Sequence, residues 1–231
     1  AYPDLDVEAE LARLDDLAEG CPEPTFEGLR RHLFDDLGFN GEVEHYYDPA
    51  NSFLNEVLRR RVGLPITLSV VCLEVGRRLG LELAGVGMPG HFLVQYEDAG
   101  GRLWMDPFAR GRLLDRAACE ERFHLVNGAS TPFLESYLDP VGPRAIVGRI
   151  LSNLKSIYAS RGNYEALSWV YALRLAIPGT PVLERRELAR LLGSTGQFIE
   201  AAETLEELVD AVPNQADALL AEAQALRARL N

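Results

Sequence analysis

The sequence has few of the residues that cross-link a protein or anchor it in a membrane. Its 231 residues include three cysteines, Cys21, Cys72 and Cys119, at wide spacing and without a CxxC pair. This pattern favours neither a zinc site nor a disulfide framework, and it is typical of a reducing compartment. No apolar run approaches the roughly 18 residues that cross a bilayer, and no charged-then-apolar leader opens the sequence. We therefore expect a cytoplasmic protein that spans no membrane.

Basic residues are also in the minority. The chain carries 23 lysines and arginines against 35 acidic residues, a formal net charge of -12. Such a charge repels nucleic acid and anionic lipid surfaces, so we expect neither as a partner. With 47% hydrophobic and 25% charged residues, the chain has enough apolar material for a sizeable core.

The most informative stretch of the sequence is GMPGHFLVQYEDAGGRLWMD. Two runs of alternating side chains flank the polar turn at residues 97–100, which is the pattern of a β-hairpin. A turn centred there places Leu93 opposite Trp104 and His91 opposite Asp106. An aspartate beside an imidazole orients a general base or a metal ligand, and the same pair also serves as a purely structural hydrogen bond.

The rest of the first 140 residues predicts helices around this hairpin. Periodicity and capping residues indicate helices near 3–20, 25–37, 53–58, 66–79 and 115–123, and a strand at 82–86. The helix at 66–79 follows Pro65 and is apolar almost all round, so we expect it to be central and buried. The predicted fold class is α+β, with a small antiparallel sheet.

A stretch rich in glycine and proline separates this part from a repetitive, helical one. We place the domain boundary there, with domains at 1–140 and 141–231. Gly162-Asn163-Tyr164 recurs as Gly196-Gln197-Phe198 after 34 residues, the period of tetratricopeptide (TPR) repeats. The expected helices lie at 144–160, 163–177, 181–194, 197–211 and 216–230. Repeats of this kind predict a protein or peptide partner bound by the helical arm.

Three motifs in this order resemble a known family. NSFLNEVLRRRVGLPITLS, GVGMPGHFLVQY and WMDPFARG are similar to the bacterial SirB-type proteins, which carry a transglutaminase-like domain followed by TPR repeats. The resemblance covers residues 48–211. It implies that His91 and Asp106 occupy the catalytic histidine and aspartate positions of the transglutaminase-like superfamily.

The resemblance also implies a cysteine nucleophile at the start of the central helix, where the helix dipole stabilises a thiolate. This sequence departs from that pattern. The position falls at Gly63-Leu64-Pro65, and no cysteine occurs between Cys21 and Cys72. Cys72 lies too far along the helix to take the role, and we expect it to be a buried apolar filler.

Other residues near the helix start offer alternatives. Thr67 or Ser69 could present a hydroxyl nucleophile to His91, or could simply bond to backbone carbonyls. Asn51 and Asn55 could donate to an oxyanion, or could cap and solvate helices. A metal site on His91 and Asp106 would need a third ligand, and the candidates are Glu74, His45 and Asp48, none at a recognised ligand spacing. We expect neither a metal nor a cofactor.

Two functions remain open. The favoured hypothesis is a binding or regulatory module, in which the transglutaminase-like domain lacks its thiol, His91 and Asp106 form a structural pair in a cleft, and the TPR arm contacts protein. The alternative is a hydrolase or acyltransferase acting on amide or ester bonds, with His91 as base, Asp106 as its orienting partner and Thr67 or Ser69 as nucleophile.

Overall fold

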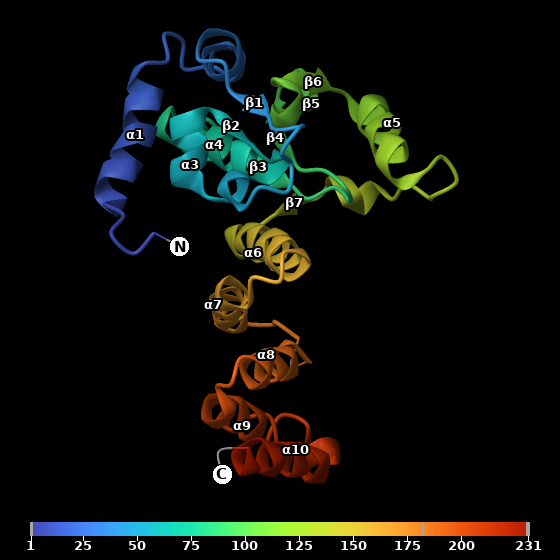
Figure 1. Ribbon diagram of the computed structural model, residues 1–231. Helices are drawn as coiled ribbons and strands as arrows, with labels where there is room; N and C mark the ends of the chain where they lie inside the picture. Colours follow the sequence, from blue (N-terminus) through green and yellow to red (C-terminus); the bar gives the residue numbers. More distant parts are fainter. Residues whose placement is uncertain (1, 182, 230–231) are drawn as a thin grey trace. The chain divides into compact units, whose positions relative to one another are not determined.

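The computed structural model describes residues 2–181 and 183–229, and the chain divides into two compact units, Ala1–Ile150 and Leu151–Asn231. The first unit combines helices with a small antiparallel sheet, and the second is helical (Figure 1). The predicted mixture of helices and a small antiparallel sheet is therefore confirmed.

The elements of the chain follow one another in this order. The first unit begins with α1 (Val7–Glu19), α2 (Phe26–Arg30), the π-helix η1 (Arg31–Asp36), β1 (Asn40–Gly41), the 3-10 helix η2 (Pro49–Ser52), α3 (Leu54–Arg60), β2 (Val62–Gly63), α4 (Pro65–Arg78) and β3 (Leu83–Val86). It continues with β4 (Leu93–Asp98), β5 (Gly101–Asp106), η3 (Pro107–Ala109), β6 (Arg112–Leu114), α5 (Arg116–Asn127), η4 (Glu135–Leu138) and β7 (Pro140–Val141). After α6 (Pro143–Ser160), which contains the boundary, come α7 (Tyr164–Leu175), α8 (Leu183–Ser194), α9 (Phe198–Glu206), η5 (Pro213–Gln215) and α10 (Ala216–Ala228).

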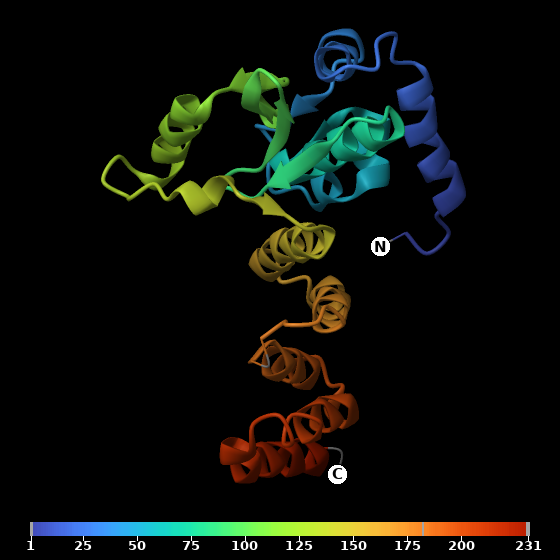
Figure 2. The same ribbon diagram turned by 180° about the vertical axis from the view of Figure 1, so that it is seen from behind.

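The five-stranded sheet has the order β6-β5-β4-β3-β7, with every neighbouring pair antiparallel. Because side chains alternate between the two sides of a strand, the two faces of this sheet contribute to two separate hydrophobic cores. Val94 and Met105 join the core of α1, α3 and α4, whereas Leu93 and Trp104 join the core that α5 covers. Figures 1 and 2 accordingly show α1 and α5 on opposite sides of the unit.

The hairpin of β4 and β5 has a different register from the predicted one. Its turn lies at residues 99–100, Asp98 pairs with Gly101, and Trp104 faces Gln95, so the prediction that Trp104 faces Leu93 is wrong by two residues. The Asp98 carboxylate fixes this shorter turn by accepting the Gly100 N–H at 2.7 Å. A shift of two leaves every side chain on its predicted face, since the strand repeat is two residues.

The central helix α4 begins at Pro65, in the first turn where proline is best tolerated, and its inner residues are buried as predicted. The segment leading into it is held by a feature that the sequence did not predict. Strands β1 and β2 pair in parallel, with Asn40 beside Val62 and Gly41 beside Gly63. This pairing fixes the backbone directly before the helix.

The second unit is built from successive neighbouring helices. Each of α7, α8 and α9 packs against the helix that follows it, and small apolar residues such as Ala189, Ala202 and Ala223 line the contacts. Helix α9 ends at Glu206, before the predicted residue 211, because residues 207–211 form turns. The predicted helices at 181–194 and 216–230 include residues 182 and 230, and these two residues lie outside the described part of the chain. Within the described ranges, no helix is both long and apolar enough to cross a bilayer.

Candidate functional site

The hairpin brings His91 and Asp106 into contact. His91 follows Gly90, whose φ is +77°, directly ahead of β4, and Asp106 is the last residue of β5. The His91 Nε2 atom lies 2.8 Å from Asp106 Oδ1, and the two side chains are only 5% and 1% exposed. The oxygen lies out of line with the ring N–H, so the pair is a close polar contact rather than an aligned hydrogen bond.

Asp106 is anchored by three further groups. Its Oδ1 atom accepts the backbone N–H groups of Phe108 at 3.0 Å and Ala109 at 3.2 Å, which caps η3. Its Oδ2 atom lies 3.1 Å from Arg122 Nη2. A buried carboxylate is tolerated when its oxygens are paired in this way.

Arg122 is a residue that the sequence analysis missed. No chemical role was assigned to the helix at 115–123, yet α5 supplies the cation that pairs with Asp106. The sequence did contain evidence for this role. Arg122 is three residues after the buried Cys119, so helical periodicity places both side chains on the same side of α5. A helical pattern in the sequence does not reveal which residue of the sheet lies opposite the buried side of α5.

Arg149 of α6 was also missed, and it fixes the backbone of the same site. Its Nη2 atom donates to the carbonyls of Met88 at 3.1 Å and His91 at 2.8 Å, and its guanidinium lies 5.5 Å from the centroid of the Phe92 ring. Burial lowers the pKa of Arg149, and the nearby Tyr46 opposes that shift. The loop ahead of β4 is therefore clamped by a half-buried arginine.

One aromatic ring borders the imidazole, and a second ring packs behind the first. The Phe108 ring lies edge-on to His91, at 6.3 Å between centroids, and to Tyr46, at 6.0 Å. Burial raises the pKa of Tyr46. The tyrosine loop is held by Asn51, whose Nδ2 donates to the carbonyl of His45 at 2.8 Å and makes a longer contact with that of Tyr46.

The two asparagines considered as oxyanion donors therefore differ in their surroundings. Asn51 is completely buried, with its amide bonded to the loop carbonyls and its Oδ1 accepting from Arg60 at 3.0 Å. Asn55 is half-buried on α3. The Asn51 amide supports the loop beside the site.

The hydroxyls at the start of α4 bond to backbone groups. Thr67 Oγ1 accepts the Leu64 N–H at 2.9 Å and lies 2.9 Å from the Asn51 carbonyl, to which it donates. Ser69 Oγ donates to the Pro65 carbonyl at 2.8 Å. Both side chains are buried, and within the described residues neither hydroxyl bonds to His91. A role for either as nucleophile stays a prediction.

The three cysteines are buried and free of disulfides. Burial strongly raises the pKa of Cys72. Burial, with a smaller contribution from the charges of Asp115 and Asp106, raises the pKa of Cys119 to about 12. Since the thiolate is the reactive form, neither of these thiols is activated at neutral pH.

The residues considered as a third metal ligand have other surroundings. Glu74 pairs with Arg77 and Arg78, Asp48 accepts the Ala50 N–H, and His45 is exposed. In the described part of the chain, no three His, Cys, Asp or Glu side chains are grouped to hold a metal ion.

A small cavity reaches Asp106 from the side of α5. Its volume is about 40 Å³, and Arg112, Leu114, Ala118, Glu121, Arg122 and Leu125 complete its lining. A space of this size has room for a water molecule beside the Asp106 carboxylate.

Comparison with known proteins assigns this fold and site to a family. The family model described as "Transglutaminase-like superfamily" matches residues 3–152, which include His91, Asp106 and all of α4. The chain belongs to the transglutaminase-like superfamily. No solved structure matches it.

Relatives of this superfamily domain occur in bacteria and in animals. A UPF0162 protein of Xylella fastidiosa is 46% identical over 140 residues, which cover 59% of this chain and 50% of that protein. A UPF0162 protein of Vibrio cholerae is 31% identical over 158 residues, covering 68% and 57%. F-box only protein 21 of the mouse is 32% identical over 149 residues, covering 61% and 22%. The chain thus spans about half the length of these two UPF0162 relatives.

Proposed function

We propose that this protein is a protein-binding or regulatory module of the transglutaminase-like superfamily, in which His91 and Asp106 form a structural pair. One observation carries the proposal. The helix start that would present a nucleophile consists of Gly63, Leu64 and Pro65, and the nearest hydroxyls, those of Thr67 and Ser69, bond to backbone groups. An acyl-transfer site needs a nucleophile within reach of its base.

The surroundings of the pair support the same proposal. Asp106 holds η3 and Arg122, and Arg149 clamps the His91 backbone. These contacts give both residues a structural purpose. The three free cysteines also support a reducing, cytoplasmic setting.

For the second unit we propose a TPR-like arm of the SirB type that contacts protein. The 34-residue recurrence supports it, as do the paired helices α7 with α8 and α9 with α10. Large apolar side chains are exposed on these helices, namely Tyr164, Leu173, Leu183, Ile199 and Leu220. Exposed apolar side chains such as these are available to contact another protein, as the proposal requires.

The full chain serves as bait to test this function, in lysate of a bacterium that carries a UPF0162 relative. We expect the wild type and His91→Ala to capture the same partner. Leu173→Lys and Ile199→Lys should each reduce capture by about tenfold, as loss of an interface hot spot does. Gln224→Lys, at an exposed polar position of α10, is the matched control and should leave capture unchanged. Equal capture by all variants, or no specific partner, would contradict the proposal.

The alternative, a hydrolase or acyltransferase acting on amide or ester bonds, rests on the imidazole itself. Its Nε2 atom is held at Asp106, while its Nδ1 atom forms no hydrogen bond within the described residues and could accept a proton. A fluorophosphonate probe decides between the two functions. Labelling of the wild type that is lost in His91→Ala and in Thr67→Val or Ser69→Ala favours the enzyme, and the absence of labelling favours the module.

A further inference from the structure

A large and mostly apolar hollow lies beside the edge of β3 in the first unit. Its volume is about 560 Å³, within the roughly 300–1,000 Å³ of sites that hold ligands. Helix α4, strand β3 and the first part of α6 line it, and every lining residue belongs to the first unit. The Val147 side chain in its wall is 50% exposed, so the apolar wall is open to solvent.

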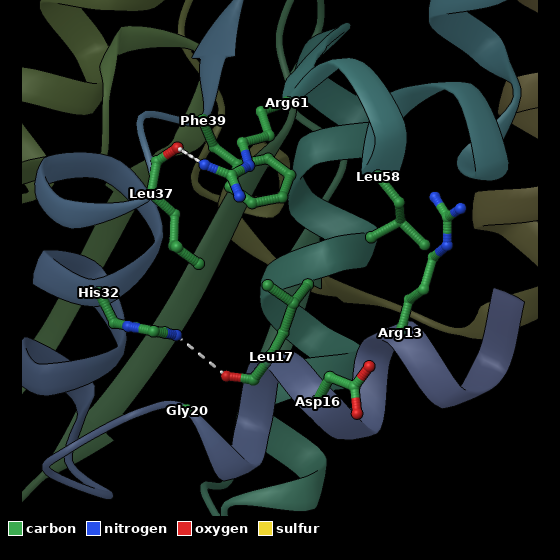
Figure 3. Close-up of a pocket in the computed structure, with 9 residues that line it drawn as sticks. All are labelled: Arg13, Asp16, Leu17, Gly20, His32, Leu37, Phe39, Leu58 and Arg61. Atoms are coloured by element: carbon green, nitrogen blue, oxygen red, sulfur yellow. Dashed lines mark hydrogen bonds between the residues drawn. The ribbon is translucent and has the colours of Figure 1, made fainter.

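A smaller cavity, of about 290 Å³, lies between α1 and η1 (Figure 3). Two of its polar side chains bond to carbonyl groups of the same wall. The His32 Nε2 atom lies 3.1 Å from the Leu17 oxygen, and Arg61 Nη1 donates to the Leu37 oxygen at 2.9 Å. The hollow beside β3 differs, because it is bordered by strand residues that have no partner strand in the described part of the chain.

Strand β7 covers only half of the β3 edge. It has two residues, which pair with Gly85 and Val86. Leu83 and Ala84 therefore have no partner on that side within residues 2–181 and 183–229. The chain leaves the sheet after Val141 to enter α6, and the hollow lies where a longer β7 would have continued.

The pairing of β7 shows that Leu83 offers a donor and an acceptor to this open side. Pro140 has no N–H, so its pairing with Val86 is of the type in which the neighbouring residues form the hydrogen bonds. Gly85 therefore exchanges bonds with Val141. Leu83, two residues away, directs its N–H and C=O groups the same way. A residue added opposite Leu83 can pair with both groups.

A side chain added opposite Leu83 points into the hollow. Leu83 packs against the core that contains α4, and a Cβ atom added at Gly76 of that helix would lie 2.4 Å from Leu83 Cδ1. Directly opposed residues of an antiparallel pair direct their side chains to the same face of the sheet. The added side chain therefore meets the side of α4 on which Val70 and Leu73 line the hollow.

We propose that this edge binds an extended peptide, which adds a strand antiparallel to β3 and places one apolar side chain in the hollow. Main-chain hydrogen bonds to Leu83 hold such a peptide, and the hollow selects the apolar side chain. A free apolar molecule would fill the hollow but leave the Leu83 groups without a partner. The site uses no residue of the helical arm, so the inference goes beyond the function proposed above.

Charge complementarity adds a basic residue to the expected peptide. Glu82, directly before β3, is exposed at the hollow and has no ion-pair partner in the described part of the chain. Arg77, the cation of the lining, is paired with Glu74 at 3.0 Å. A basic residue next to the apolar one pairs with Glu82 across the two strands. Because Glu82 is exposed, this contact contributes less than the backbone bonds and the buried side chain.

Fluorescence anisotropy with labelled, capped hexapeptides and the full chain tests the proposal. We expect the probe Thr-Thr-Leu-Lys-Thr-Thr to bind saturably, with a Kd below about 1 mM. A methyl group on the leucine nitrogen removes the donor to the Leu83 carbonyl and should weaken binding at least about tenfold. A methyl group on the lysine nitrogen, which faces away from β3, is the matched control and should change the Kd less than about threefold.

Two results with these peptides overturn the proposal. Equal binding of the probe and its leucine-methylated form would show that the hollow takes an apolar group alone, without strand addition. The absence of saturable binding up to about 1 mM peptide would show that the edge takes no strand of this kind.

Substitutions on the protein test the assigned residues. Val147→Glu places a charge in the wall of the hollow at an exposed position, so binding should fall at least about tenfold while the Tm is unchanged. Val43→Glu, the same change at a valine that is 74% exposed and outside the hollow, is the control and should bind like the wild type. Unchanged affinity in Val147→Glu contradicts the site.

A charge reversal tests the role of Glu82, and the arm variants separate the two proposals. Glu82→Lys should weaken binding of the probe about threefold, and replacing the lysine of the probe by glutamate should restore it. An unchanged preference for the lysine peptide contradicts the role of Glu82. Leu173→Lys and Ile199→Lys, which test the helical arm, should bind the probe like the wild type, so the failure of either proposal is distinguishable from that of the other.

Discussion

Asp106 is the residue on which the geometry of the candidate site depends most. A single carboxylate, 1% exposed, contacts an imidazole, a guanidinium and two backbone N–H groups. Removing one partner of a buried ion pair is costly because the other charge is left without compensation. Asp106 is therefore important for stability whether or not the pair has a chemical role.

We expect Asp106→Ala to lower the free energy of unfolding by about 3 kcal/mol, the cost of breaking a buried pair. Asp106→Asn should lose less, because its amide oxygen can still accept the Phe108 and Ala109 N–H groups. Glu97→Ala, which breaks an exposed pair with Arg102 in the same hairpin, should cost less than about 1 kcal/mol. Urea unfolding measures all three, and equal losses for Asp106→Ala and Glu97→Ala would refute the anchoring role.

Cys119 predicts a dependence of stability on alkaline pH. Its pKa is raised to about 12 in the folded protein, against about 8.5 for a free cysteine, so the folded chain retains a proton that the unfolded chain loses. The stability that this thiol contributes is fully present below pH 8.5 or so and is lost as the pH rises toward 12. Well above about pH 8.5, the wild type should lose up to about 1.4 kcal/mol per pH unit relative to Cys119→Ala. If the free energies of unfolding of the two proteins change equally with pH in this range, the prediction is wrong.

At the scale of elements, short and irregular pieces decide how the site is enclosed. Strand β1 has two residues, yet a Cβ atom added at Gly41 would lie 2.5 Å from the Phe108 ring and 2.6 Å from the Phe108 carbonyl oxygen. Glycine is thus required there for close approach. This contact holds η3 and the aromatic ring next to His91.

Gly41→Ala should therefore destabilise the protein by about 2–3 kcal/mol, as overpacking of a well-packed region does. Gly80→Ala is the control, because it introduces the same side chain at a glycine that has space around it but an unfavourable backbone conformation. Gly80 has φ +74° with nothing near its missing Cβ atom, so only the backbone penalty of about 1 kcal/mol applies. Chemical denaturation compares the two, and a loss in Gly41→Ala no larger than in Gly80→Ala would show that Phe108 moves freely.

At the scale of the whole molecule, charge decides which partners are compatible. A net charge of -12 repels polyanions, whereas the exposed apolar side chains of the helical unit favour protein contacts. The match of this domain to UPF0162 proteins and to F-box only protein 21 shows that it occurs with different neighbouring sequences. Any partner is thus expected to be a protein.

Fluorescence anisotropy with a labelled DNA duplex tests the prediction that the protein does not bind nucleic acid. We expect no binding up to about 100 µM protein at about 0.1 M salt, because an acidic protein gains no counterion release from DNA. A saturable signal that weakens as salt is added would reveal a local basic surface and contradict this expectation.

The sequence determined the features that depend on local pattern. Alternation around a polar turn placed His91 and Asp106 on one face, and apolar periodicity with Pro65 and Gly80 marked the buried helix α4. The 34-residue recurrence likewise located the helices of the second unit. Each of these follows from residues close together in the chain, since helical and strand periods act over a few positions.

Only the tertiary structure decided which distant residues meet. The hairpin register, the pairing of β1 with β2, the partners Arg122 and Arg149 and the cavity beside Arg61 all depend on how separate elements pack. A helical pattern says which side of α5 is buried and nothing about the strand that it covers. Long-range contacts are selected by the total packing of the core, and that selection leaves no local periodic signal in the chain.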